Sequence, residues 1–271
     1  MWRQAFRPLF IFGSLFSIIA LLVWVSALEG QPLFTPYGGA LFWHAHEMIF
    51  GFGAAIIIGF LLTAVQNWTG IRATHGAPLI LLCCLWLLAR AGWLFNLGQL
   101  PWLLLVLDVS FLLTAGFFMA RLVLKAGNYR NLIFVPLILL LSAANVLTHL
   151  SLILAQPVLF NWGAYSAIML VVFLMVLISG RVVPMFTANG THTQRASPWP
   201  WLEKAVVICT ASSALLFMSH SQNRLPHALL VALFAVTAGV NFLRALRWRP
   251  RVIWSTPLVW SLHLAYWFIP L

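Results

Sequence analysis

Residues 43–48 read WHAHEM and lie near the start of the apolar run Ala40–Val65. Two histidines and one of the chain's 4 acidic residues therefore fall within a stretch that otherwise suits lipid. A charged side chain inside a membrane span costs about 3 kcal/mol, so a functional role is the first interpretation. On a helix, His44 and His46 lie about 160° apart, whereas His44 and Glu47 lie about 60° apart. We expect the two imidazoles to serve different sites, or one to support the other; the alternative is that both hydrogen-bond to neighbouring helices.

Composition assigns the chain to membrane proteins. Of its 271 residues 63% are hydrophobic and 7% are charged, and the mean hydropathy is +0.99. No soluble domain could bury so much apolar surface, so we predict an all-α integral membrane protein. The net charge of +11 could suit nucleic acid, but the basic residues lie in short gaps between apolar runs, which is the pattern of membrane topology. We therefore expect a lipid bilayer as partner and no nucleic acid.

Long apolar runs predict the architecture. A membrane span needs about 20 apolar residues, and the chain contains about nine such runs. The expected spans are Leu9–Leu28, Ala40–Val65, Ala77–Phe95, Trp102–Leu124, Leu132–Leu154, Leu159–Ile178, Leu202–Ser219, Leu225–Leu246 and Ile253–Leu271. The longest connection, from Ser179 to Trp201, contains Pro184, which we expect to end the preceding helix. The prediction is a polytopic transmembrane helix bundle that forms a single integral membrane domain over residues 1–271.

Basic residues predict the orientation of this bundle. All but two of the 15 Lys and Arg residues flank span ends on one side; Arg90 lies within a span and Arg224 on the other side. The positive-inside rule then places the N-terminus and the basic loops in the cytoplasm. Within their spans, Arg90 and Asp108 both lie in outer halves. We expect a buried ion pair between them, and the alternative is that Arg90 contacts a haem propionate.

The same orientation places several histidines at similar depth. His44, His46 and His149 lie about one turn below the outer surface, and His263 lies in the middle or outer half of its span. Neutral imidazole binds haem iron, copper and zinc. We therefore expect a metal site near the outer face. Its hypothetical ligands are His46 and His149, as axial or copper ligands, with His44 and Glu47 as a second site or support and His263 completing the cluster.

Several segments resemble, in order along the chain, motifs of the NnrS family. They are FRPLF at 6–10, WHAHEM at 43–48, FGF at 50–52, GFLLTA at 59–64, NWTG at 67–70, SGRVVP at 179–184 and the segment 257–266. The resemblance implies a multi-pass protein of the bacterial cytoplasmic (inner) membrane that contains haem and copper. It also implies a link to nitric oxide or a related small molecule, in denitrification or in resistance to nitrosative stress. Six motif residues have no role assigned by the resemblance: Asn67, Trp68, Gly70, Gly180, Arg181 and Pro184.

Several functional questions stay open at this stage. The residues show no acid–base pair with a defined substrate, so an enzymatic activity is neither predicted nor excluded, and the sequence allows an oligomer. One alternative is an electron carrier with bis-histidine haem, and another is a proton-coupled transporter that uses His44, His46, Glu47 and Asp108. Family members continue beyond the ninth span with a further outer histidine. A short variant with an incomplete metal site, or an inactive truncation, is therefore the last alternative.

Overall fold

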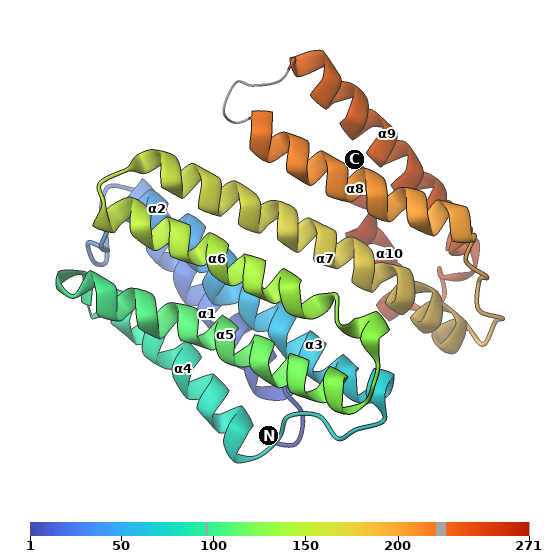
Figure 1. Ribbon diagram of the computed structural model, residues 1–271, viewed down its shortest axis with the longest axis horizontal. Coiled ribbons are helices and arrows are strands. Elements are labelled where there is room, and N and C mark those ends of the chain that lie inside the picture. Colours follow the sequence, from blue (N-terminus) through green and yellow to red (C-terminus); the bar gives the residue numbers. More distant parts are fainter. Residues whose placement is uncertain (96, 221–225, 271) are drawn as a thin grey trace. The chain divides into compact units, whose positions relative to one another are not determined.

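The computed structural model describes residues 1–95, 97–220 and 226–270, and all regular structure in these ranges is helical (Figure 1). Eight helices are long and apolar enough to cross a membrane, which confirms the predicted polytopic α-helical class. They are α1 (Phe6–Leu28), the helix over Ala40–Thr69, α4 (Ala77–Leu94), α5 (Pro101–Lys125), the helix over Tyr129–Ile153 that contains α6 (Phe134–Ile153), α7 (Pro157–Thr191), α8 (Pro200–His220) and α9 (His227–Arg247).

The ninth expected span is shorter than its apolar run. Within Ile253–Leu271 the regular helix is α10 (Pro257–Trp267), because Pro257 sits in its first turn and the chain before it turns. Its 11 residues extend about 16 Å, roughly half the hydrocarbon core. Leu271 and Arg224, the one base expected in the outer loops, lie outside the described residues. The cytoplasmic N-terminus stays a prediction from the positive-inside rule.

The second membrane-crossing helix changes its winding where the WHAHEM motif ends. It consists of α2 (Ala40–His46), a π-helical stretch over Glu47–Gly53 and α3 (Ala54–Thr69). π-helical turns are rare overall but frequent at functional sites, so the π-helical stretch is a second indication that the WHAHEM motif has a functional role. The helix ends at Gly70, whose φ of 70° is left-handed and whose N–H donates to the carbonyl of Gln66. Gly70 of the NWTG motif therefore provides a left-handed C-cap for this helix.

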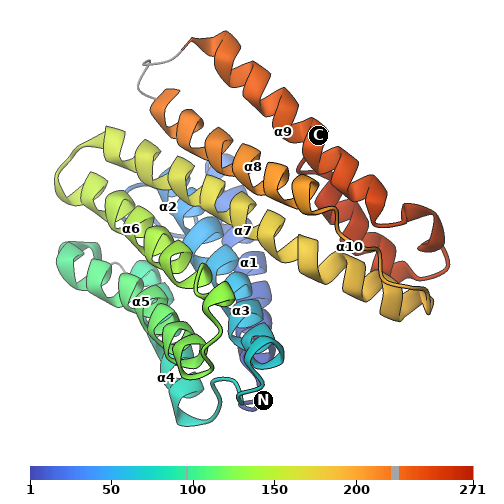
Figure 2. The ribbon, with the colours of Figure 1, turned by 45° about the vertical axis from the view of Figure 1, so that its right-hand side comes forward.

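The described chain divides into two compact units, an N-terminal unit over Met1–Ile168 and a C-terminal unit over Met169–Leu271, with the boundary inside α7. In the N-terminal unit α5 packs between α4 and α6 and against α3, while α1 packs against α3; Figures 1 and 2 show α4, α5 and α6 side by side. The single domain expected from the sequence stays a prediction.

In the C-terminal unit, α7 runs through Pro184, so the predicted helix end at this residue is wrong. A proline inside a helix removes the hydrogen bond to the carbonyl four residues earlier, here Gly180. Membrane helices tolerate this where side chains and neighbouring helices satisfy the backbone, and the Thr187 Oγ1 donates to the Val183 carbonyl at 2.8 Å. Gly180 itself lies against α9, because a Cβ there would overlap the Arg244 guanidinium.

Candidate metal centre

A cluster of ionisable side chains lies in the core of the N-terminal unit. It contains Glu47 from the π-helical stretch, His46 from α2, Arg90 from α4, Asp108 from α5 and His149 from α6. All five residues are at most 3% exposed. Groups that are this costly to bury in a membrane protein must compensate one another or bind something. The packing of four helices therefore creates one polar site from residues that are far apart in the sequence.

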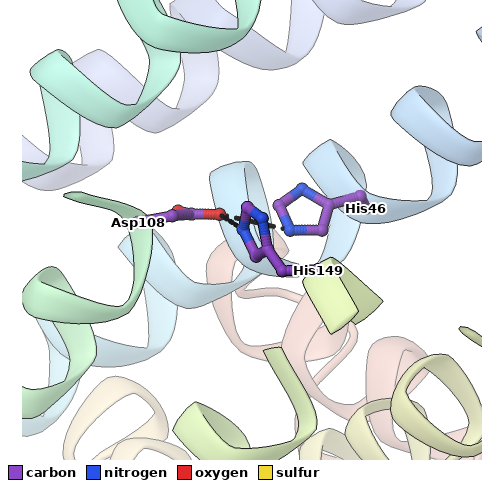
Figure 3. A group of neighbouring side chains, drawn as sticks. All are labelled: His46, Asp108 and His149. Atoms are coloured by element: carbon purple, nitrogen blue, oxygen red, sulfur yellow. Dashed lines mark hydrogen bonds and ion pairs between the residues drawn. The ribbon is translucent and has the colours of Figure 1, made fainter. Parts of the chain in front are cut away.

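Two imidazoles converge on a single carboxylate oxygen in this cluster, as Figure 3 shows. The Oδ2 atom of Asp108 lies 3.0 Å from Nε2 of His149 and 3.2 Å from Nε2 of His46. The three potential ligand atoms lie within 4.8 Å of one another. The two rings are 5.2 Å apart and nearly perpendicular, at 82°. Two imidazole nitrogens and one carboxylate oxygen at this spacing are a donor set that suits one small transition-metal ion.

Both ring nitrogens of His46 face oxygen acceptors. Nδ1 lies 3.0 Å from Oε1 of Glu47, and Nε2 lies 2.9 Å from Oδ1 of Asn145 as well as near Asp108. A neutral imidazole carries only one N–H, so these contacts require either a second proton or a cation beside Nε2. An imidazole that donates its N–H to a carboxylate while its other nitrogen binds an ion is the usual arrangement of metal-ligating histidines. Glu47 is placed to orient His46 in this way.

The charges of the cluster balance only with one further positive charge, either a proton on an imidazole or a bound metal ion. Arg90 donates from Nη1 to Oε1 of Glu47 at 3.0 Å and from Nη2 to Oδ1 of Asp108, so the predicted Arg90–Asp108 ion pair is confirmed. Two carboxylates against one guanidinium leave one negative charge buried, which is costly unless a proton or a metal ion offsets it. Four buried atoms in or beside the cluster also lack hydrogen-bond partners: Oε2 of Glu47, Nε of Arg90, Nδ2 of Asn145 and Nε1 of Trp93.

Two of the histidines expected at the site have other surroundings. The ring of His44 stacks on Trp24 of α1, with centroids 4.5 Å apart. The partners of Glu47 are instead Arg90 and His46, whose Nη1 and Nδ1 atoms each lie 3.0 Å from its Oε1. His263 lies in the C-terminal unit, where its Nε2 is 2.8 Å from the Thr187 hydroxyl. Their assignment as ligands stays a prediction that no contact of either ring supports.

Two residues of the site were not among the ligands expected from the sequence. Asp108 was expected only as the partner of Arg90, or in a transporter's relay, although it is one of just 4 acidic residues in the chain. Asn145 precedes His149 by four residues and therefore lies on the same face of α6. That spacing, together with a carboxylate in the middle of a span, is the sequence signal that could have identified both.

The motif residues of unassigned role make structural contacts. The ring of Trp68 stacks on Phe134 at 5.1 Å, and its carbonyl accepts a hydrogen bond from Asn128. In the C-terminal unit, the carbonyl of Arg181 accepts from Arg195 at 3.3 Å. Asn67 is exposed beside Trp68 in the last turn of α3. Among these residues no side chain belongs to the cluster around Asp108.

Replacing Gly51 with alanine should destabilise the protein by about 1–3 kcal/mol, because overpacking a tight core forces side chains to move. A Cβ at this position would lie 2.7 Å from Nη1 of Arg90 and 2.8 Å from the ring of Phe16. Thermal melting in detergent micelles measures the effect. Gly116→Ala is the control, since its Cβ would meet Ile138 at an ordinary 3.5 Å. Equal melting of the two variants would contradict this role of Gly51.

Comparison with known proteins places the chain in a family. No curated protein and no solved structure matches it. A protein-family profile described as "NnrS protein" matches residues 1–271, the full length of the sequence. This match over the whole sequence shows that the chain belongs to the NnrS family.

Proposed function

We propose that this protein is a metalloprotein of the bacterial inner membrane in which His46, Asp108 and His149 bind one transition-metal ion. The metal interacts with nitric oxide or a related small molecule, and the protein acts in the response to nitrosative stress. One observation carries the proposal: two imidazole nitrogens converge on one oxygen of Asp108 inside a buried cluster in which two carboxylates share one guanidinium. Membership of the NnrS family supports the same proposal of a metal-binding membrane protein.

The donor set favours copper or non-haem iron. Imidazole suits both metals, and two histidines with one carboxylate are the ligands of non-haem iron sites with open coordination positions. When bound, the ion supplies a position at which a small diatomic molecule can coordinate. The protein's own residues position the ligands: Glu47 orients His46, and Arg90 holds Asp108 in place. The buried ring of Trp93 excludes water from the site, since it lies 4.9 Å from the ring of His46 and 5.4 Å from that of His149.

Haem does not fit between His46 and His149. Axial imidazoles lie on opposite faces of a macrocycle and point their nitrogens at each other through the iron. Here both Nε2 atoms point at the Asp108 carboxylate, and the ring planes meet edge to face with centroids only 5.2 Å apart. The guanidinium of Arg90, for which contact with a haem propionate was the alternative to an ion pair, is already engaged by two carboxylates. We therefore assign no haem to this pair of histidines.

Metal analysis of the detergent-purified protein tests the proposal. We expect close to one copper or iron per chain and an absorption or paramagnetic resonance signal that changes on addition of nitric oxide. His149→Ala should lose most of the metal, because it removes one of three ligands, whereas His44→Ala should retain it. Equal metal contents of the two variants would contradict the assignment. If the signal of the wild-type protein does not change on addition of nitric oxide, the assignment of the metal site would stand but the proposed role in binding a small molecule would be refuted.

The hydrogen bonds of the cluster favour one second candidate, a proton-coupled transporter. From Glu47 through His46 and Asp108 to His149, each side chain lies within 3.2 Å of the next, so a proton could be stored or passed along this chain of groups. This candidate predicts a well-folded wild-type protein that takes up no copper or iron during anaerobic reconstitution. It also predicts proton movement when the protein is placed in vesicles.

A further inference from the structure

A second polar feature lies at one end of the N-terminal unit, away from the buried cluster. Here the chain leaves α3, enters α4 and meets the last turns of α5, and a cavity of about 330 Å³ lies between these segments. We call it the basic cavity, because Arg72 and His75 line it from the loop after α3, and Arg121 and Lys125 line it from α5. By the positive-inside rule this end faces the cytoplasm.

The cations of the basic cavity have no carboxylate to balance them. None of the three residues Arg72, Arg121 and Lys125 forms an ion pair with any described residue. Two of the 4 acidic residues are engaged by Arg90, and Glu203 pairs with Arg244 in the C-terminal unit. The fourth acidic residue, Glu29, follows the C-terminal end of α1, about 34 Å from the start of that helix.

The arrangement of the charges is itself unfavourable without an anion. Arg121 and Lys125 are four residues apart on α5, so they lie on one face of the helix and repel each other. Arg72 adds a third positive charge across the same cavity. A bound anion would turn this repulsion into attraction, and guanidinium groups bind phosphate oxygens through paired hydrogen bonds.

The walls of the basic cavity point to an amphipathic anion. Phe118 and Leu122, on the same turns of α5 as the cations, line it together with Pro78 at the start of α4. A free phosphate ion would gain nothing from these apolar side chains, whereas the glycerol and acyl carbons of a lipid would pack against them. Basic pockets between membrane helices on the cytoplasmic side commonly bind lipid headgroups, and the volume lies within the usual range of ligand pockets.

We propose that the basic cavity binds the phosphate headgroup of an anionic phospholipid, such as phosphatidylglycerol, in the cytoplasmic leaflet. Arg72 and Arg121 contact the phosphate, Lys125 adds attraction at longer range, and the lipid's apolar part lies along Phe118 and Leu122. Phosphatidylcholine should bind poorly, because the three cations repel its choline. The proposal is independent of the metal centre and rests on different residues.

Native mass spectrometry of the delipidated full-length chain, with phosphatidylglycerol or phosphatidylcholine of matched acyl chains, tests the proposal. We expect about tenfold tighter binding of phosphatidylglycerol, and a loss of about tenfold in Arg72→Gln or Arg121→Gln, since each removes a charge-assisted contact. Both side chains are exposed, so the substitutions leave the core packing intact. Arg130→Gln is the matched control, an exposed arginine close to the end of α5 that does not line the basic cavity.

Three outcomes would overturn the proposal. The first is equal binding of the two lipids. The second is a loss in Arg130→Gln as large as that in Arg121→Gln, which would mean diffuse surface charge and no site. The third is complete displacement of phosphatidylglycerol by millimolar inorganic phosphate, which would identify a soluble anion as the ligand. None of these outcomes depends on whether the protein carries metal.

Discussion

Asp108→Asn should lower the affinity of the purified protein for copper or iron by at least about 100-fold. Replacing a group that merely orients a ligand costs 10–100-fold in metal affinity, and Asp108 is proposed as a ligand itself. The amide would keep the size of the side chain but lose its negative charge, so the two imidazoles would converge on a neutral group. Metal titration of the variant in detergent, followed by elemental analysis after gel filtration, measures the change.

Glu203→Gln is the matched control for this experiment. Glu203 is also a carboxylate bound by an arginine, since Arg244 donates to it from Nε at 3.1 Å, but it lies in the C-terminal unit. Its variant should therefore keep the wild-type metal affinity. If Asp108→Asn binds metal as the wild type does, Asp108 is not a ligand, and the cluster is better explained as a proton-handling network.

The sequence predicts the spans and part of the site well. Apolar runs of sufficient length can form only helices in a bilayer, so the eight crossing helices follow from hydropathy. The Arg90–Asp108 pair follows from the cost of leaving either charge alone in adjacent spans. The similar depth of His46 and His149 also follows from counting residues along their spans. All of these predictions need only the position of a residue along its own helix.

What the sequence could not predict depends on how helices are rotated and what lies beside them. The angle between His44 and Glu47 on an ideal helix made them a plausible pair, but in the structure the carboxylate contacts Arg90 on α4 and His46. Similarly, Pro184 would end an isolated helix, yet α7 continues past it to Thr191 in the C-terminal unit. Convergence of His46 and His149 on one oxygen requires the packing of three helices, which hydropathy does not encode.

Arg90→Met should lower the free energy of unfolding by about 3–5 kcal/mol, the cost of breaking a buried ion pair from one side. Methionine fills much of the same space, but it leaves two carboxylates buried with no guanidinium between them. Titration with a denaturing detergent, or thermal melting in micelles, measures the change. The double variant Arg90→Met/Glu47→Gln should recover part of the loss, because it removes one of the two uncompensated charges.

The same variant separates the two roles that the cluster could have. If a metal ion is the further cation of the site, its binding should stabilise Arg90→Met by more than it stabilises the wild type. The ion then supplies positive charge that the guanidinium otherwise provides in part. A proton-handling network predicts no such gain from copper or iron, and it predicts that acidification, not metal, restores stability. A loss below about 1 kcal/mol in Arg90→Met would contradict both, because it would mean that the carboxylates carry no buried charge.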